Sequence, residues 1–187
     1  MLSYSGIGVR ATAGEQFTWG LTGLRFACQA GAWFFADSPE RCPEAAPTVA
    51  AAAYQQFEHG FMIWTQTPDR FYVFFDDAQQ FLFADAPYDF APEAPVAELP
   101  PARLFAPVSG FGKLWRNELA WWRDTEIRGR LGWATAPEFA YDATRQCELP
   151  SYPGMWSCYL QTPDGRVLAM RPDSTAQVHF VWEWQHE

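Results

Sequence analysis

Short runs of apolar and aromatic residues, each bounded by residues that favour turns, set the strongest limit on how this chain can fold. Residues 60–66 and 71–75 flank the sequence Thr-Pro-Asp-Arg at 67–70, and proline followed by aspartate is favoured inside turns. We therefore expect an antiparallel hairpin there, with residues 79–83 as a third strand. Residues 177–184 alternate as in a half-buried strand, and one face carries Val178, Phe180, Trp182 and Trp184.

The turn sequence of this hairpin occurs a second time in the chain. Gln66-Thr67-Pro68-Asp69 is repeated as Gln161-Thr162-Pro163-Asp164, at an offset of 95 residues (161 − 66). Each copy is followed by an apolar segment of strand length, at residues 71–75 and 167–170. Identical turns between matching segments indicate an internal duplication with one hairpin in each copy.

One stretch has the periodicity of a helix. Within residues 112–127, Trp115, Leu119 and Trp122 recur on one helical face, and Gly129 and Gly132 follow as helix terminators. The preceding residues 86–107 contain six prolines, too many for a regular element. The sequence thus predicts a mainly β fold with one amphipathic helix, in the α+β class, built from antiparallel hairpins in a repeat-like arrangement.

Four cysteines allow three disulfide pairings, and their positions favour one of them. Two cysteines lie close together toward each end of the chain, so local pairing joins Cys28 to Cys42 and Cys147 to Cys158. Buried free thiols are one alternative, and a metal or catalytic role is another, although the Cys-x₂₋₄-Cys spacing of structural zinc sites is missing. Two disulfides predict an oxidising compartment, and hence an extracellular or cell-envelope protein.

Charge and motif content argue against several functions. A net charge of −9 and a pI of about 4.7 disfavour a nucleic-acid partner, because a phosphate backbone would be repelled. No run approaches the roughly 20 apolar residues of a membrane span. The Gly-x-Gly-x-x-Ala pattern at residues 6–11 has no room for the strand that precedes a dinucleotide site. Carboxylates and histidines show no catalytic or metal-ligand spacing, so we expect no enzymatic activity, no cofactor and no metal.

Three short motifs follow one another along the chain: QFEHGFMIW at 56–64, GKLWR at 112–116 and LGWATAPE at 131–138. Over residues 54–140 this order resembles the LGFP-type repeat of bacterial cell-surface proteins, although Ala134 stands where that family usually has proline. The resemblance implies a structural motif formed by Glu58, Gly60, Trp64, Trp115, Gly132, Trp133 and Glu138. It also implies a division within one compact domain: an N-terminal β segment at 1–42 as a partial unit, a repeat-like unit at 43–140 with a Pro-rich insertion at 86–107, and a second hairpin unit at 141–187.

A binding role follows from the resemblance and from the aromatic content. Ten tryptophans exceed what the core of such a domain needs, and exposed indole faces stack on sugars or anchor protein interfaces. Those outside the repeat motif, and so freer to face a partner, are Trp19, Trp33, Trp121 and Trp156. We expect a non-catalytic cell-envelope module that recognises a wall polysaccharide or a surface protein. The alternatives are a structural accessory subunit of a larger extracytoplasmic assembly and, less favoured, a small glycan hydrolase.

Overall fold

Strands dominate the parts of the chain that the computed structural model describes, which are residues 2–13, 16–84, 98–116, 127–149, 157–172 and 180–185. The strands are β1 (Leu2–Ala13), β2 (Gln16–Ala27), β3 (Thr48–Phe57), β4 (Gly60–Thr65), β5 (Arg70–Phe75), β6 (Gln79–Ala84), β7 (Phe139–Cys147), β8 (Cys158–Gln161), β9 (Val167–Pro172) and β10 (Phe180–Gln185). Two short helices, α2 (Ser109–Arg116) and α3 (Ile127–Leu131), lie between β6 and β7. The predicted mainly β fold of antiparallel hairpins is confirmed.

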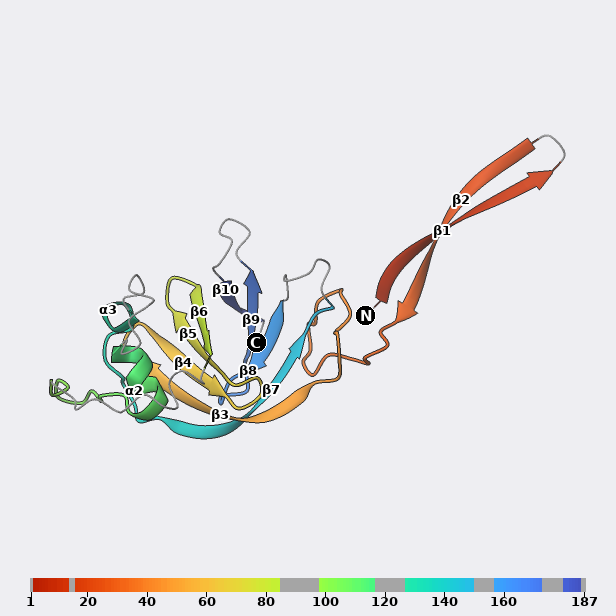
Figure 1. Cartoon of the computed structure of the whole chain (residues 1–187). Coiled ribbons are helices and arrows are strands. Elements are labelled where there is room, and N and C mark those ends of the chain that lie inside the picture. The colour runs from red at the N-terminus through yellow and green to blue at the C-terminus, as the bar shows by residue number, and fades with distance from the viewer. Residues whose placement is uncertain are drawn as a thin grey trace.

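The strands from β3 onward close into an antiparallel barrel, in the order β10-β6-β5-β4-β3-β7-β8-β9 (Figure 1). Two four-stranded meanders, β3–β6 and β7–β10, build it, and they join where β3 pairs with β7 and where β6 pairs with β10. The β6–β10 junction that closes the barrel is short, because it pairs Phe180 with Gln80 and Val181 with Gln79 and no further residues of these two strands. β1 and β2 form a separate two-stranded sheet. The boundary expected between residues 140 and 141 falls inside β7, so the barrel draws strands from both sides of it.

The β4–β5 hairpin forms where the sequence predicted it. Thr65 pairs with Arg70 across the turn, and the Thr65 hydroxyl donates a hydrogen bond to the backbone oxygen of Pro68 at 2.6 Å. Successive side chains alternate between the barrel interior, which holds Ile63, and the outer face, which holds Met62. Both residues are fully buried, which explains why this hairpin is apolar on both faces.

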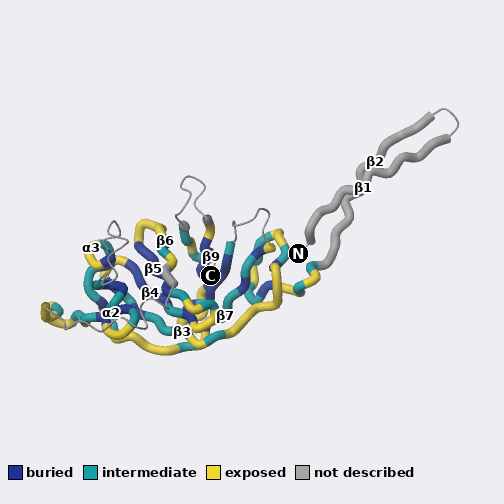
Figure 2. The backbone as a smooth tube through the Cα atoms, viewed as in Figure 1, coloured by how far each residue is buried: buried dark blue, intermediate teal, exposed yellow. Residues whose placement is uncertain are grey.

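Two segments that precede the meanders bury the outer face of the barrel wall (Figure 2). The helical segment, residues 105–116 and 127–138, covers β4 and β5, and its Trp115 and Leu131 share a cluster with Met62. The 28–47 segment covers β8 and β9, where Trp33 packs edge-on against Tyr159 with ring centroids 5.0 Å apart. Figure 1 shows the two segments on opposite sides of the barrel. Each meander is therefore covered by the segment that leads into the other meander.

Equivalent hydrogen bonds relate the two covering segments. The amide of Glu44 donates to Cys147 O, and the amide of Thr135 donates to Gln56 O. The two donors are 91 residues apart in the sequence (135 − 44), and so are the two acceptors (147 − 56). The same shift relates the bridge Pro43–Glu148 to the bridge Ala134–Phe57.

Two indole groups extend this correspondence. Trp33 Nε1 donates to Arg41 O at 3.0 Å, and Trp115 Nε1 donates to Gly132 O at 2.8 Å, where the two acceptors obey the same shift. The order of buried, half-buried and exposed residues along Thr48–Gln56 also matches that along Phe139–Cys147. These correspondences support the internal duplication that the repeated turn sequence indicated, and both turns join two strands as expected.

A buried glutamine holds each covering segment against the barrel wall. Gln146 is 3% exposed and bonds three backbone groups, donating to Ala32 O and Ala45 O and accepting from the amide of Phe34. Gln55, its counterpart, is 2% exposed and donates to Ala136 O, while its Oε1 has no partner among the described residues. The two sites are equivalent in position but unequal in the bonds they make.

We expect Gln146→Leu to lower the free energy of unfolding by about 2–3 kcal/mol, because it removes the three hydrogen bonds by which Gln146 holds the backbone of the 28–47 segment. Gln55→Leu should cost less than about 1 kcal/mol, because it also removes an unpaired acceptor. Denaturant melts of both variants measure the difference. Equal losses would contradict the role assigned to Gln146.

The predicted helix at 112–127 is confirmed in part. α2 begins earlier, at Ser109, and buries Trp115 as expected. Residues 117–126, with Leu119 and Trp122, lie outside the described residues. Gly129 lies within α3 rather than after a helix, whereas Gly132 follows α3 with a φ of 72°. The expected single helix is therefore represented by two in the described part of the chain.

Both predicted disulfides are present, Cys28–Cys42 and Cys147–Cys158. The first closes a loop within the 28–47 segment, and the second joins facing residues of β7 and β8. Loops of this length contribute about 3 kcal/mol each in the chain-entropy model. Among the described residues, no helix has the length and apolar character needed to cross a membrane.

Candidate functional site

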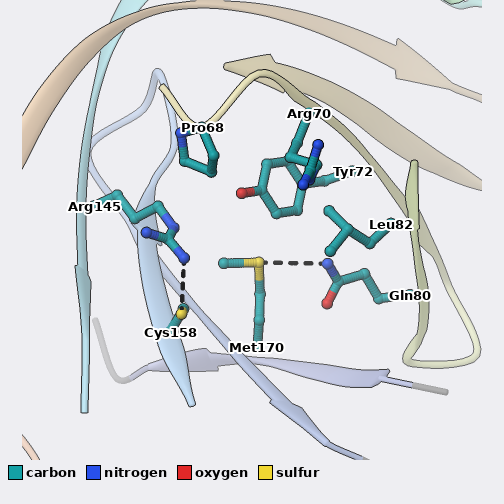
Figure 3. A pocket seen from close by; sticks show the side chains of 8 residues that line it. All are labelled: Pro68, Arg70, Tyr72, Gln80, Leu82, Arg145, Cys158 and Met170. Atoms are coloured by element: carbon teal, nitrogen blue, oxygen red, sulfur yellow. Dashed lines mark hydrogen bonds between the residues drawn. The ribbon is translucent and has the colours of Figure 1, made fainter. Parts of the chain in front are cut away.

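A cavity of about 260 Å³ lies in the barrel interior, at the end where the β4–β5 turn lies (Figure 3). Its walls come from one turn and five strands, through Pro68, Arg70, Tyr72, Gln80, Leu82, Arg145, Cys158 and Met170. An eight-stranded barrel has room to be filled by its own side chains or to hold one small ligand. The cavity makes this end of the barrel the candidate binding site.

The cavity wall contains polar atoms without partners. Gln80 is 3% exposed, and its Nε2 donates only to the weak acceptor Met170 Sδ at 3.5 Å. Its Oε1, together with Arg145 Nε, is buried and has no hydrogen-bond partner among the described residues. An unsatisfied buried polar group costs about 1–3 kcal/mol. A ligand that supplied the missing partners would recover part of that free energy.

Two arginines give the cavity a positive character in a chain whose net charge is −9. Arg145 Nη2 donates to Cys158 Sγ at 3.0 Å, as Figure 3 shows, and Arg70 Nη1 donates to the backbone oxygen of Asp69 at 3.1 Å. Neither guanidinium forms an ion pair with a carboxylate among the described residues. The remaining side chains of the wall contribute no carboxylate, so neither charge is neutralised there.

Aromatic rings fill the interior toward the opposite end of the barrel. Tyr54 stacks on Phe61 with centroids 5.5 Å apart, and Phe61 stacks on Phe74 at 4.7 Å and on Trp184 at 6.1 Å. Burial, followed by the nearby charge of Asp164, raises the pKa of Tyr54 to about 12. The two ends of the barrel therefore differ in packing, although the two meanders repeat each other.

Five residues of the expected structural motif come together beside the helical segment. Glu58 Oε2 accepts from the amide of Trp133 at 2.8 Å, and Trp115 packs against Trp133 with centroids 5.0 Å apart. At Gly132, with φ 72°, an added Cβ would lie 2.5 Å from Glu58 Oε2. Gly60 is enclosed still more tightly, since an added Cβ would lie 2.0 Å from the backbone oxygen of Phe74 and 2.9 Å from Leu131 Cδ2. Packing and backbone geometry account for these residues.

The other two expected motif residues, Trp64 and Glu138, make no contact with Glu58 that the structure records. Trp64, at the far end of β4, donates from Nε1 to Asp69 Oδ1 at 3.1 Å. Glu138 is an exposed residue immediately before β7. Trp64 nevertheless packs against the same buried cluster as Trp115 and Trp133, so of the expected motif residues it is Glu138 that stands apart.

The tryptophans expected to face a partner are placed only in part. Trp33 is 8% exposed and packs on Phe35 and Tyr159, so the expectation that it faces a partner is not met. Its burial follows from covering the outer face of β8 and β9, a long-range contact that the local sequence does not reveal. Trp19 lies on β2, opposite Arg10. Trp121 and Trp156 lie outside the described residues.

The cavity residues were missed because their positions depend on strand register. Arg145 faces the interior only because β7 pairs with β8 so that Arg145 lies opposite Leu160. One signal was present in the sequence: Gln80 lies in β6 directly before the apolar residues 81–83. A polar side chain at an inward position of such a strand marks either a hydrogen-bond network or a ligand contact.

Comparison with protein-family models, with curated proteins and with solved structures gave no match. The resemblance to the LGFP-type repeat therefore stays a prediction. In the described ranges, no group of three or more His, Cys, Asp or Glu side chains is placed to hold a metal ion. The geometry of the cavity carries the functional argument that follows.

Proposed function

We propose that the protein is a non-catalytic binding module and that its ligand occupies the barrel cavity near the β4–β5 turn. The observation that carries the proposal is the unpartnered pair of polar atoms, Gln80 Oε1 and Arg145 Nε, on the wall of an otherwise largely apolar cavity. Apolar walls with a few convergent polar groups are typical of small-molecule sites. Arg145 and Gln80 can supply hydrogen bonds and charge to a ligand, and the apolar side chains of the wall can supply contact area.

An extracytoplasmic location is part of the proposal. Two disulfides fit an oxidising compartment, where such bonds form and persist. We place the protein outside the cytoplasm, at the cell surface or in the envelope, in line with the resemblance to a surface repeat. A role as an accessory subunit of a larger assembly is compatible with the same site.

The tryptophan faces give less support to a polysaccharide platform. The guanidinium of Arg128 lies 4.5 Å from the ring centroid of Trp115 and 5.1 Å from that of Trp133. Arg166 lies 3.6 Å from the centroid of Trp184 in the same way. These three tryptophans already stack on arginines. Binding of a wall polysaccharide or a surface protein therefore stays a prediction that concerns Trp19, Trp121 and Trp156.

A blocked cavity provides the test. Leu82 lines the cavity and is 42% exposed, so Leu82→Trp should fill the mouth without disturbing the core. Val49→Trp is the matched control, because Val49 is 67% exposed and is not among the residues that line the cavity. We would screen fragments of about ten heavy atoms, the size that fits such a volume, by saturation-transfer NMR.

Fragments should bind the unmodified protein and Val49→Trp equally well. Leu82→Trp should lower their affinity by at least about tenfold, which is about 1.4 kcal/mol. Two results would overturn the proposal: no fragment bound by the unmodified protein, or fragments bound equally well by Leu82→Trp.

A further inference from the structure

We infer that the ligand of the barrel cavity is a small amphipathic carboxylic acid. Its carboxylate would pair with Arg145 inside the cavity, and its apolar body would lie against Leu82 and Met170. This inference rests on the proposed function and narrows it to a chemical class. It is carried by charge, by hydrogen-bonding capacity and by volume.

The charge argument concerns Arg145. Among the described residues its Nε, a buried atom, has no hydrogen-bond partner, and its Nη2 donates to a disulfide sulfur, which is a weak acceptor. Arg145 is half-buried, and a charge partly withdrawn from water is costly unless an anion compensates it. Among the described residues no carboxylate fills that role. An anionic group on the ligand would provide the missing partner, and Arg70 on the same wall adds to the attraction.

The cost of burying charge and the match of donors to acceptors favour a carboxylate over a phosphate. With one Nη2 hydrogen directed at Cys158, Arg145 keeps four of its five N–H donors, and a planar carboxylate accepts two of them as a bidentate pair. A phosphate carries close to two negative charges, and moving that charge into a largely apolar cavity costs more than moving the single charge of a carboxylate. The apolar remainder of the wall, with Leu82, Met170 and Pro68, suits a hydrocarbon body.

The volume sets the size of the acid. A cavity of 150 Å³ accommodates benzene, so a cavity of about 260 Å³ accommodates a body of roughly ten heavy atoms. Octanoate is a suitable probe of this size. Octan-1-ol and octyl phosphate share its chain and differ only in the polar group.

Titration calorimetry with these three probes tests the inference. The unmodified protein should bind octanoate at least about tenfold more tightly than octan-1-ol, the effect expected for a charged hydrogen bond. Octanoate should also bind more tightly than octyl phosphate. Arg145→Gln should lower the affinity for octanoate by about 10- to 100-fold and change the affinity for octan-1-ol by less than about threefold. Arg103→Gln removes the same charge from an exposed residue away from the cavity and should leave all three affinities unchanged.

Arg70→Gln provides a second variant if Arg145→Gln fails to fold, and it should weaken octanoate selectively as well. Equal binding of octanoate and octan-1-ol, or tighter binding of octyl phosphate, would overturn the carboxylic acid while leaving a cavity that binds small molecules. Binding of other fragments but not of octanoate would do the same. A failure of every fragment, or equal binding of fragments by Leu82→Trp, would overturn the proposed function itself.

Discussion

Replacing Gly60 with alanine is expected to lower the free energy of unfolding by more than about 4 kcal/mol, a loss seen only with severe steric conflict. Gly60 begins β4 with a φ of 142°, a region that residues with a side chain rarely adopt. An added Cβ would lie 2.0 Å from the backbone oxygen of Phe74 and 2.9 Å from Leu131 Cδ2. The Phe74 carbonyl belongs to β5, which pairs with β4, so it cannot retreat without disrupting the hairpin.

Gly165→Ala separates the steric conflict from the backbone cost. Gly165 also has a positive φ, of 84°, but an added Cβ there would meet no atom within 4 Å. We expect Gly165→Ala to lower the free energy of unfolding, measured in denaturant melts, by about 1 kcal/mol. Similar losses for the two variants would mean that the close approach of β4 and β5 at Gly60 has been placed wrongly.

Trp115→Ala is expected to cost about 3–5 kcal/mol, the usual result of emptying a large aromatic site in a core. Trp115 is 2% exposed and shares a buried cluster with Met62 and Leu131. Its Nε1 also donates to Gly132 O, which holds the loop after α3 against α2. The substitution therefore removes packing and a hydrogen bond that joins both helices.

Trp133→Ala is the matched comparison, because Trp133 is half-buried at the edge of the same cluster. It should cost clearly less than Trp115→Ala when both are measured by chemical denaturation. A change below about 1 kcal/mol for Trp115→Ala would mean that this face of α2 meets solvent or a partner instead of the barrel.

Features set by local sequence were predictable. The β4–β5 hairpin follows from a Pro-Asp turn between apolar runs, and both disulfides follow from cysteines that are close in sequence. The duplicated turn correctly indicated two hairpins. In each of these cases the residues that interact lie within about 15 positions of one another, so short-range rules apply.

Features set by long-range pairing were not predictable. Barrel closure depends on β6 meeting β10, and the burial of Trp33 depends on the 28–47 segment crossing to β8 and β9. The cavity depends on register, since a shift of one residue would turn Arg145 to the outer face. Periodicity along one strand cannot supply these relations, and the aromatic residues were accordingly assigned to a surface role that Trp33 does not have.

Methionine methyl NMR tests most directly whether the cavity is a binding site. Of the four methionines in the chain, Met170 lines the cavity, and Met62 lies in the cluster outside the barrel wall. With ¹³C-methyl-methionine labelling, and with the Met170 signal assigned from Met170→Leu, a bound fragment should shift the methyl resonance of Met170 and leave that of Met62 in place. Binding that leaves Met170 unmoved would contradict a ligand site inside the barrel.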